Sequence, residues 1–131
     1  MEAAATGILL DTTVLIDLLR HQKEAVAQVR ELALRGFALA ICPITVAELY
    51  AGMRKGEEQS TEELISAFQW LPLSRDVARK AGEIVAAKRR AGRTHALDDM
   101  MIAATAIHYG YSLLTENRKD FAVQGIQLYS E

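Results

Sequence analysis

Apolar and polar residues alternate along this chain in short blocks of two kinds. Runs of about four apolar residues bounded by polar ones are typical of buried strands, whereas apolar residues that recur every three or four positions are typical of helices. The apolar runs predict strands at residues 7–10, 38–42, 70–73, 112–115 and 126–129. The periodic segments predict helices at residues 12–20, 23–34, 45–55, 62–69, 76–91 and 99–109, with a polar turn at 57–63.

Strands that alternate with helices favour an α/β fold with a central, mainly parallel sheet. The chain has 131 residues, half of them hydrophobic, so we expect a single domain over residues 1–131 with its own core. In parallel sheets, ligands bind outside the carboxyl ends of the strands. Asp11 directly follows the first predicted strand and is therefore expected at such an end.

Nothing in the sequence indicates export or insertion into a membrane. No stretch approaches the roughly 20 apolar residues of a transmembrane helix, and the opening residues MEAAATG lack the basic segment and apolar core of a signal peptide. The one cysteine, Cys42, lies in an apolar run, where a small core residue is expected rather than a nucleophile. We therefore expect a cytoplasmic protein without a disulfide.

Positive charge is concentrated in one part of a chain whose net charge is −2. Between residues 79 and 93, six cationic residues stand against one acid, Glu83, which gives that segment a charge of +5. The six are Arg79, Lys80, Lys88, Arg89, Arg90 and Arg93. A basic stripe on an acidic protein can attract a polyanion, although it can equally be the solvated face of a helix.

Acidic residues recur at the predicted junctions between strands and helices. Asp11 opens the first helix, Glu48 lies near the start of the third, and Asp98–Asp99 precede a helix that is apolar almost all round. Each has a structural explanation, because Asp11 and Asp98 suit helix N-caps and Thr45 with Glu48 fits a capping box. Together they suggest a shared crevice, since helices that start beside strand ends bring their first turns to one edge of the sheet.

Carboxylates that share a crevice repel one another, and a cation relieves that repulsion. An oxygen-only ligand set suits a hard divalent ion such as Mg²⁺ or Mn²⁺. Zinc is disfavoured because His21, His95 and His108 lack zinc spacing, and the sequence has no glycine-rich phosphate loop. A carboxylate-bound metal ion beside a basic stripe suggests hydrolysis of phosphodiester bonds by a metal-activated water.

Four segments in order carry a family resemblance: LLDTTVLIDLL (9–19), ITVAELYAG (44–52), LDDMMIAATA (97–106) and LLTENRKDF (113–121). Over nearly its whole length the chain resembles the PIN domain, and most closely the VapC-type ribonuclease toxins of bacterial toxin–antitoxin pairs. The resemblance implies a three-layer α/β/α fold with a central parallel sheet and an Mg²⁺- or Mn²⁺-dependent endoribonuclease site. It also implies a homodimer and a cognate antitoxin whose tail occupies the active-site groove.

The same resemblance assigns roles to individual acids. Asp11, Glu48 and Asp99 match the three metal-binding acids of the family, and Ile102 fixes the register of Asp99. Asp98 then becomes a neighbouring residue that suits the N-cap of its helix.

The fourth position departs from the family pattern. Many members carry an acid two residues after the strand-end threonine, Thr115, but this chain has Asn117 there. Asn117 can ligate a metal ion through its carbonyl oxygen or hold a water without adding charge, and Asp120 is near enough in sequence to compensate. Whether a second metal ion binds is therefore open. Thr115 and Thr13 are expected to support the site with their hydroxyls.

An RNA substrate would give the basic stripe a role, and Lys88, Arg89, Arg90 and Arg93 are then expected to contact phosphates. Other functions stay open at this point. A structure-specific DNA nuclease uses the same metal chemistry, and a non-catalytic binding module would use the acids only as caps. A signalling receiver domain is disfavoured, because no second acid adjoins Asp11 and residues 70–74 carry no acid to accept a phosphoryl group.

Overall fold

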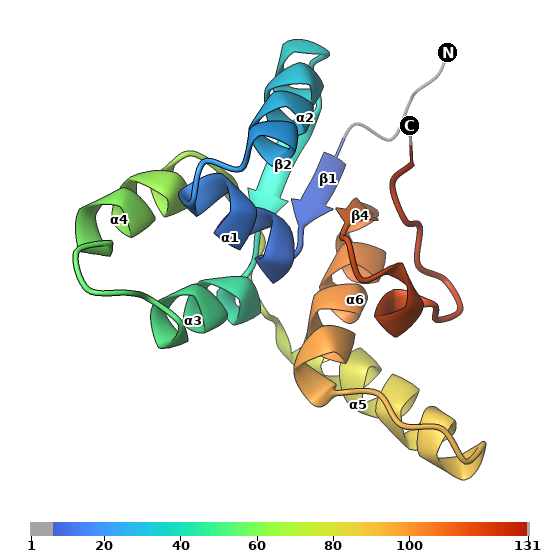
Figure 1. The fold of residues 1–131 in the computed structure, drawn as a ribbon. Coiled ribbons are helices and arrows are strands. Elements are labelled where there is room, and N and C mark those ends of the chain that lie inside the picture. The colour runs from blue at the N-terminus through green and yellow to red at the C-terminus, as the bar shows by residue number, and fades with distance from the viewer. Residues whose placement is uncertain (1–6, 131) are drawn as a thin grey trace.

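A sheet of four short parallel strands lies at the centre of the protein in the computed structural model, which describes residues 7–130 (Figure 1). The strands are β1 (Gly7–Leu10), β2 (Ala38–Ile41), β3 (Gln69–Trp70) and β4 (Ser112–Leu114). Their order across the sheet is β3–β2–β1–β4, and each neighbouring pair runs parallel. The predicted α/β fold with a parallel sheet is confirmed.

Within residues 7–130, six α-helices and one 3-10 helix join or follow these strands. They are α1 (Thr12–Leu19), α2 (Lys23–Leu34), α3 (Pro43–Ala51), α4 (Glu58–Ser66), α5 (Arg75–Arg90), α6 (Leu97–Tyr109) and the 3-10 helix η1 (Arg118–Phe121). No helix in this described part of the chain is long and apolar enough to span a membrane.

Helices cover both faces of the sheet, because successive side chains of a strand point to opposite sides. Ile8 and Leu10 of β1 pack in one core with buried residues of α1, α2 and α3, whereas Leu9 packs in a second core with buried residues of α5 and α6. Figure 1 shows α1–α4 on one side of the strands and α5 and α6 on the other. The predicted three-layer α/β/α arrangement is therefore confirmed.

The N-terminal ends of three helices lie together at the carboxyl edge of the sheet. The Asp11 N–H donates to the Leu114 carbonyl over 3.0 Å, which ties the end of β1 to the end of β4. α1 follows β1 after one residue, α3 follows β2 after one residue, and α6 packs against α3. The first turns of three helices are therefore gathered beside Asp11.

Two predicted boundaries are wrong near α4. The segment 57–63, predicted as a polar turn, is mostly helical, because α4 begins at Glu58. The buried residue of its first half is Thr61, and a polar residue at that position interrupts the apolar periodicity on which the prediction relied. The following strand is β3, which ends before Leu71 rather than running over residues 70–73, and Pro72 has no N–H with which to continue a ladder.

The strand predicted at residues 126–129 is reduced to one bridge, between Leu113 and Leu128. Two hydrogen bonds hold it: the Leu113 N–H donates to the Gln127 carbonyl and the Tyr129 N–H donates to the Leu113 carbonyl, each over 2.8 Å. The C-terminal segment is thus fastened at one point beside β4 and does not add a strand to the sheet.

Gly7 opens β1 under the ring of Tyr111, and we expect this close approach to be sensitive to substitution. A Cβ atom at Gly7 would lie 2.7 Å from three Tyr111 ring atoms, and the Tyr111 hydroxyl is held by a 2.9 Å hydrogen bond to Gln69 Oε1. Gly7→Ala should lower the free energy of unfolding by about 1–3 kcal/mol in urea titrations. The loss should shrink in a Tyr111→Ala background. Equal losses in both backgrounds would show that the Tyr111 ring is not the obstacle.

Candidate active site

Asp11 is the buried anchor of the acidic edge, with 3% of its surface exposed. One carboxylate oxygen accepts the Thr12 N–H over 2.6 Å, which makes Asp11 the N-cap of α1 as predicted. The other oxygen accepts the Thr115 hydroxyl over 2.7 Å and the Thr13 hydroxyl over 3.3 Å. Three donors therefore compensate for the burial of this carboxylate and fix its orientation.

Glu48 is not part of a helix cap. α3 begins at Pro43, and the Cys42 N–H donates to the Thr45 hydroxyl over 3.4 Å while that hydroxyl donates to the Cys42 carbonyl over 2.9 Å. The predicted capping box of Thr45 and Glu48 is therefore wrong, since Glu48 lies in the second turn, beyond the unbonded N–H groups of the helix start. Cys42 is fully buried, which confirms it as a core residue.

The Glu48 carboxyl is bound to two neighbours at the edge of the sheet. It accepts a hydrogen bond from the Thr12 hydroxyl and is also hydrogen-bonded to the Asp98 carboxyl. Burial, the Asp98 hydrogen bond and the negative charges of Asp98 and Asp11 raise the pKa of Glu48 to about 7, against the lowering effect of Thr12. The bond with Glu48 lowers the pKa of Asp98. The two carboxyls therefore share one proton, and the opposite shifts of their pKa values favour its position on Glu48.

Asp98 and Asp99 lie in the first turn of α6. The N-cap of this helix is Ala96, so the prediction that Asp98 is the N-cap is wrong. Burial raises the pKa of Asp99 to about 6, and the negative charges of Asp98, Asp11 and Asp120 add to this effect, while His95 opposes it. Asp99 therefore lies within electrostatic reach of the Asp11 carboxylate, as a shared site requires.

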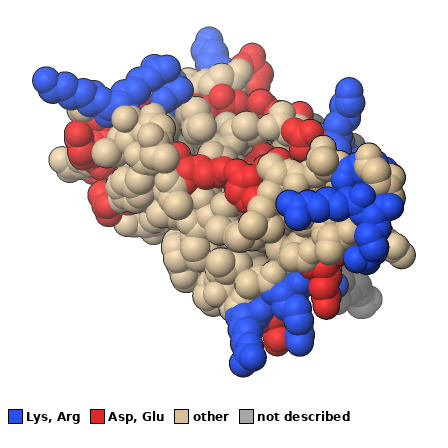
Figure 2. Space-filling model, turned by 90° about the horizontal axis from the view of Figure 1, so that it is seen from below, with Lys and Arg blue, Asp and Glu red and all other residues tan. Residues whose placement is uncertain are grey.

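Four acids from three parts of the chain thus interact at the carboxyl edge of the sheet: Asp11, Glu48, Asp98 and Asp99. Figure 2 looks at the molecule from this side and shows acidic side chains across the middle of the face, with Lys and Arg around its rim. Among residues 7–130, no three Asp, Glu, His or Cys side chains converge on a single metal position as they stand. The Glu48 carboxyl is instead engaged with Asp98 and Thr12.

The segment after β4 brings Thr115, Asn117 and Asp120 to the same edge. The Asn117 N–H donates to the Thr115 hydroxyl over 2.9 Å, and that hydroxyl in turn donates to Asp11. Asp120 acts on the cluster through its charge, which contributes to the raised pKa of Asp99. Asn117 therefore contributes a backbone contact, whereas Asp120 contributes a negative charge.

Sequence reasoning missed two neighbours of the site. Thr12 bridges to Glu48 from the residue next to Asp11, a position that could have been noticed as a hydroxyl at the strand end. Glu116 is hydrogen-bonded to Asp17, and that bond, followed by burial, raises the pKa of Glu116. No pattern in the sequence pairs these two acids, because 99 residues separate them.

The four basic residues predicted to contact RNA lie at the end of α5 and in the loop that follows it. They are Lys88, Arg89, Arg90 and Arg93. Within residues 7–130 they form no ion pair with the acidic cluster. Cations in the last turn of a helix are also favoured by the helix dipole, so position alone does not assign them a ligand.

A comparison with known families identifies the class to which this fold and this acidic edge belong. The family model of the PIN domain matches residues 8–125, and the chain belongs to the PIN-domain family. Within that family its relatives include the ribonucleases named VapC. It is 36% identical over 115 residues to Ribonuclease VapC19 of Mycobacterium tuberculosis, an alignment that covers 86% of this chain and 90% of that protein. It is 31% identical over 131 residues to Ribonuclease VapC1 of Rickettsia felis, covering 93% and 94%.

Several solved structures with the same fold are toxin–antitoxin complexes. A VapBC2 structure from Rickettsia felis, bound to a DNA fragment from its promoter, matches with a TM-score of 0.82 at 25% identity, covering 94% of this chain and 97% of that one. A toxin–antitoxin complex from Klebsiella pneumoniae matches with a TM-score of 0.73 at 32% identity, covering 91% and 94%. The predicted family, the PIN domain of VapC type, is confirmed.

The Thr115 hydroxyl should be a measurable part of the support for Asp11. Thr115→Val keeps the volume but removes the 2.7 Å donor from a buried carboxylate, and we expect the free energy of unfolding to fall by about 1–3 kcal/mol. Thr115→Ser should keep most of the stability, and Thr13→Val should cost less because its bond is longer, 3.3 Å. Urea titrations measure all three, and a Thr115→Ser variant as unstable as Thr115→Val would contradict this role.

The metal-free protein should carry a pH-dependent penalty from Glu48 and Asp99. Both have a pKa above the ordinary value, about 7 against 4.5 and about 6 against 3.8, so the folded state binds more protons than the unfolded state. The stability that the protonated forms of Glu48 and Asp99 contribute is fully present below about pH 4. It is lost as the pH rises through about 6 and 7, because the folded protein must then ionise both carboxyls. In a chelator, the melting temperature of Glu48→Gln relative to the parent should therefore rise between pH 5 and pH 8.

Glu31, an exposed acid on α2, supplies the control for this measurement. An equal rise in the melting temperature of Glu31→Gln relative to the parent would mean that the effect does not come from the acidic edge. A flat difference for Glu48→Gln would show that burial and neighbouring charges do not disfavour ionisation of this carboxyl.

Proposed function

We propose that this chain, acting as one PIN-like domain, is an endoribonuclease that hydrolyses RNA phosphodiester bonds with the help of a divalent metal ion. Asp11, Glu48 and Asp99 would hold the ion. The observation that carries the proposal is the group of mutually repelling carboxylates at the carboxyl edge of a PIN-domain sheet, two of which have a raised pKa. The name ribonuclease borne by the VapC relatives favours RNA over a structure-specific DNA substrate.

The donor set fits a hard cation. All candidate donors are oxygen atoms, and Mg²⁺ binds in proteins through one or two carboxylates while keeping several waters, so three direct ligands are not required. Asp11 and Asp99 are close enough for their charges to interact, and Glu48 can join them when its carboxyl turns away from Asp98. The ligand set suits Mg²⁺ and Mn²⁺ alike.

Each side chain would have a distinct role in such a metal site. A bound divalent ion would supply a more acidic water and would neutralise charge that develops on the scissile phosphate. Thr115 and Thr13 hold the Asp11 carboxylate in place, and Thr12 holds Glu48. The proton that Glu48 shares with Asp98 would have to leave for Glu48 to hold a cation, so metal affinity should increase with pH.

The wider assignment follows from the relatives. The neighbours solved as toxin–antitoxin complexes support a cognate antitoxin as partner, and the chain then acts as the toxin of such a pair. We also propose a homodimer, a cytoplasmic location and phosphate contacts from Lys88, at the basic end of α5, and from Arg93 in the loop that follows. A non-catalytic module with acids serving only as caps is disfavoured, because Glu48 and Asp99 cap no helix.

Cleavage should depend on the metal and on Asp11. Asp11→Asn retains an oxygen that can accept the Thr12 N–H, so the helix cap and the fold should survive while metal binding is weakened. We expect RNA cleavage to fall by about 100-fold or more and to stop in chelator. The measurement is the rate of cleavage of cellular RNA with Mg²⁺ or Mn²⁺, with a melting curve for each variant.

Matched controls come from the neighbouring acids. Asp17→Asn makes the same change on the same helix at an acid whose partner is Glu116, and it should cut RNA like the parent. Asp99→Asn should lose more activity than Asp98→Asn. Parent-like cleavage by Asp11→Asn would overturn the metal site.

A further inference from the structure

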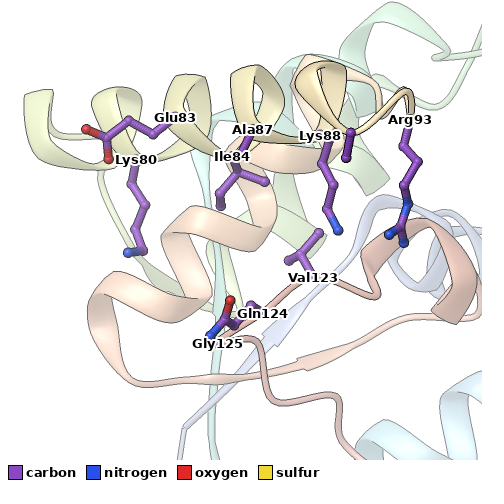
Figure 3. Close-up of a pocket in the computed structure, with 10 residues that line it drawn as sticks. Lys80, Glu83, Ile84, Ala87, Lys88, Arg93, Val123, Gln124 and Gly125 are labelled. Carbon is purple, nitrogen blue, oxygen red and sulfur yellow. The ribbon is translucent and has the colours of Figure 1, made fainter.

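A recess lies between α5 and the segment that follows η1, and it is separate from the acidic cluster. It has a volume of about 560 Å³. Figure 3 shows Lys80 and Lys88 of α5 and Arg93 of the next loop extending toward the segment with Val123 and Gln124. We call this recess the α5 groove.

Its lining combines positive charge with an apolar floor. Ile84, Ala87 and Val123 supply apolar surface, and three cations stand against one acid, Glu83. Within residues 7–130, the side chains of Lys80, Lys88 and Arg93 form no ion pair. The charge of the α5 groove is therefore not neutralised by the chain itself, which favours an anionic ligand.

Only some cations of the basic stripe line the α5 groove. Lys88 and Arg93 line it together with Lys80, whereas Arg89 and Arg90, in the same last turn of α5, do not. Lys80 and Lys88 are eight residues apart on one helix, which separates them by about 12 Å along the axis. That span matches several successive phosphates of a nucleic-acid strand.

Both walls of the α5 groove lead directly to the acidic cluster. The loop with Arg93 continues into α6, and Arg93 and Asp99 are six residues apart, at most about 20 Å along an extended chain. The opposite wall follows η1, which carries Asp120. The two walls are joined where His95 Nδ1–H donates to the Asp120 carbonyl over 3.2 Å.

We propose that the α5 groove is a second contact site for the substrate, which binds the phosphate backbone of a single-stranded RNA segment next to the bonds that are cut. The inference rests on the proposed function. Among the described residues, no aromatic side chain lines the groove, so these residues offer no stacking platform for bases and would contact the backbone independently of sequence. The protein has a net charge of −2 and an acidic cleavage site, both of which repel RNA. The α5 groove would supply the positive charge that attracts the substrate.

Binding of a labelled RNA in chelator tests this directly, because no cleavage is needed. The probe is a fluorescein-labelled, unstructured 20-nucleotide RNA, measured by fluorescence anisotropy with the full chain over a range of salt concentrations. Removing two phosphate contacts with Lys88→Ala/Arg93→Ala should weaken binding by roughly 10- to 30-fold near 0.1 M salt and reduce the salt slope by about 1.4. Adding Lys80→Ala should weaken it further.

Arg89→Ala/Arg90→Ala is the matched control, since it removes the same charge from the same end of α5. It should bind within about twofold of the parent, and melting curves should show that both double variants are folded. If both double variants lose RNA affinity equally, the attraction comes from the general positive potential at this end of α5, and the groove proposal is wrong. Lack of RNA binding by the parent in chelator would also overturn it.

An acidic peptide supplies the last comparison. If labelled oligoglutamate of equal length binds as tightly as RNA and depends equally on Lys88 and Arg93, the groove is a peptide site and the RNA assignment is wrong. The proposed function fails separately, when the parent binds RNA but does not cut it with Mg²⁺ or Mn²⁺. If the parent cuts RNA and Lys88→Ala/Arg93→Ala binds it like the parent, only the groove inference fails.

Discussion

Negative charge buried at the carboxyl edge of the sheet is the constraint on which the rest of this structure depends. Asp11 is tolerated at 3% exposure because donors reach it from α1 and from the end of β4. Because β4 lies beside β1 in the sheet, the Thr115 hydroxyl at the end of β4 can donate a hydrogen bond to this carboxylate. Any arrangement that moved Thr115 away would leave a buried charge with too few partners, which is costly in a protein interior.

The other charged residues of the site are arranged around the buried Asp11 carboxylate. Glu48 and Asp98 share a proton, and burial together with the negative charges of its neighbours raises the pKa of Asp99. A bound cation would relieve this repulsion. Within residues 7–130, Lys88 and Arg93 form no ion pair with these acids and line the α5 groove instead. Opposite charges are thus kept apart, with the proposed metal site at the acidic edge and the proposed phosphate contacts in the α5 groove.

Sequence patterns predicted the parallel α/β fold and the elements that carry the acids, because apolar runs and helical periodicity are local signals. They failed at α4, whose buried residue is Thr61, and at the starts of α3 and α6, where Cys42 and Ala96 are the N-caps. The contacts of Thr12 with Glu48 and of Glu48 with Asp98 could not be predicted. They depend on side-chain orientation across 36 or more residues, which no local pattern records.

The hydrogen bond from the Asp11 N–H to the Leu114 carbonyl has a further consequence for how the protein can be switched off. This amide extends the ladder between β1 and β4, so it opens only when β4, at one edge of the sheet, separates from β1. Disassembling the anchor of the acidic edge therefore requires the separation of a whole pair of strands. A partner that silences this protein without denaturing it has to cover the edge or compete for what binds there.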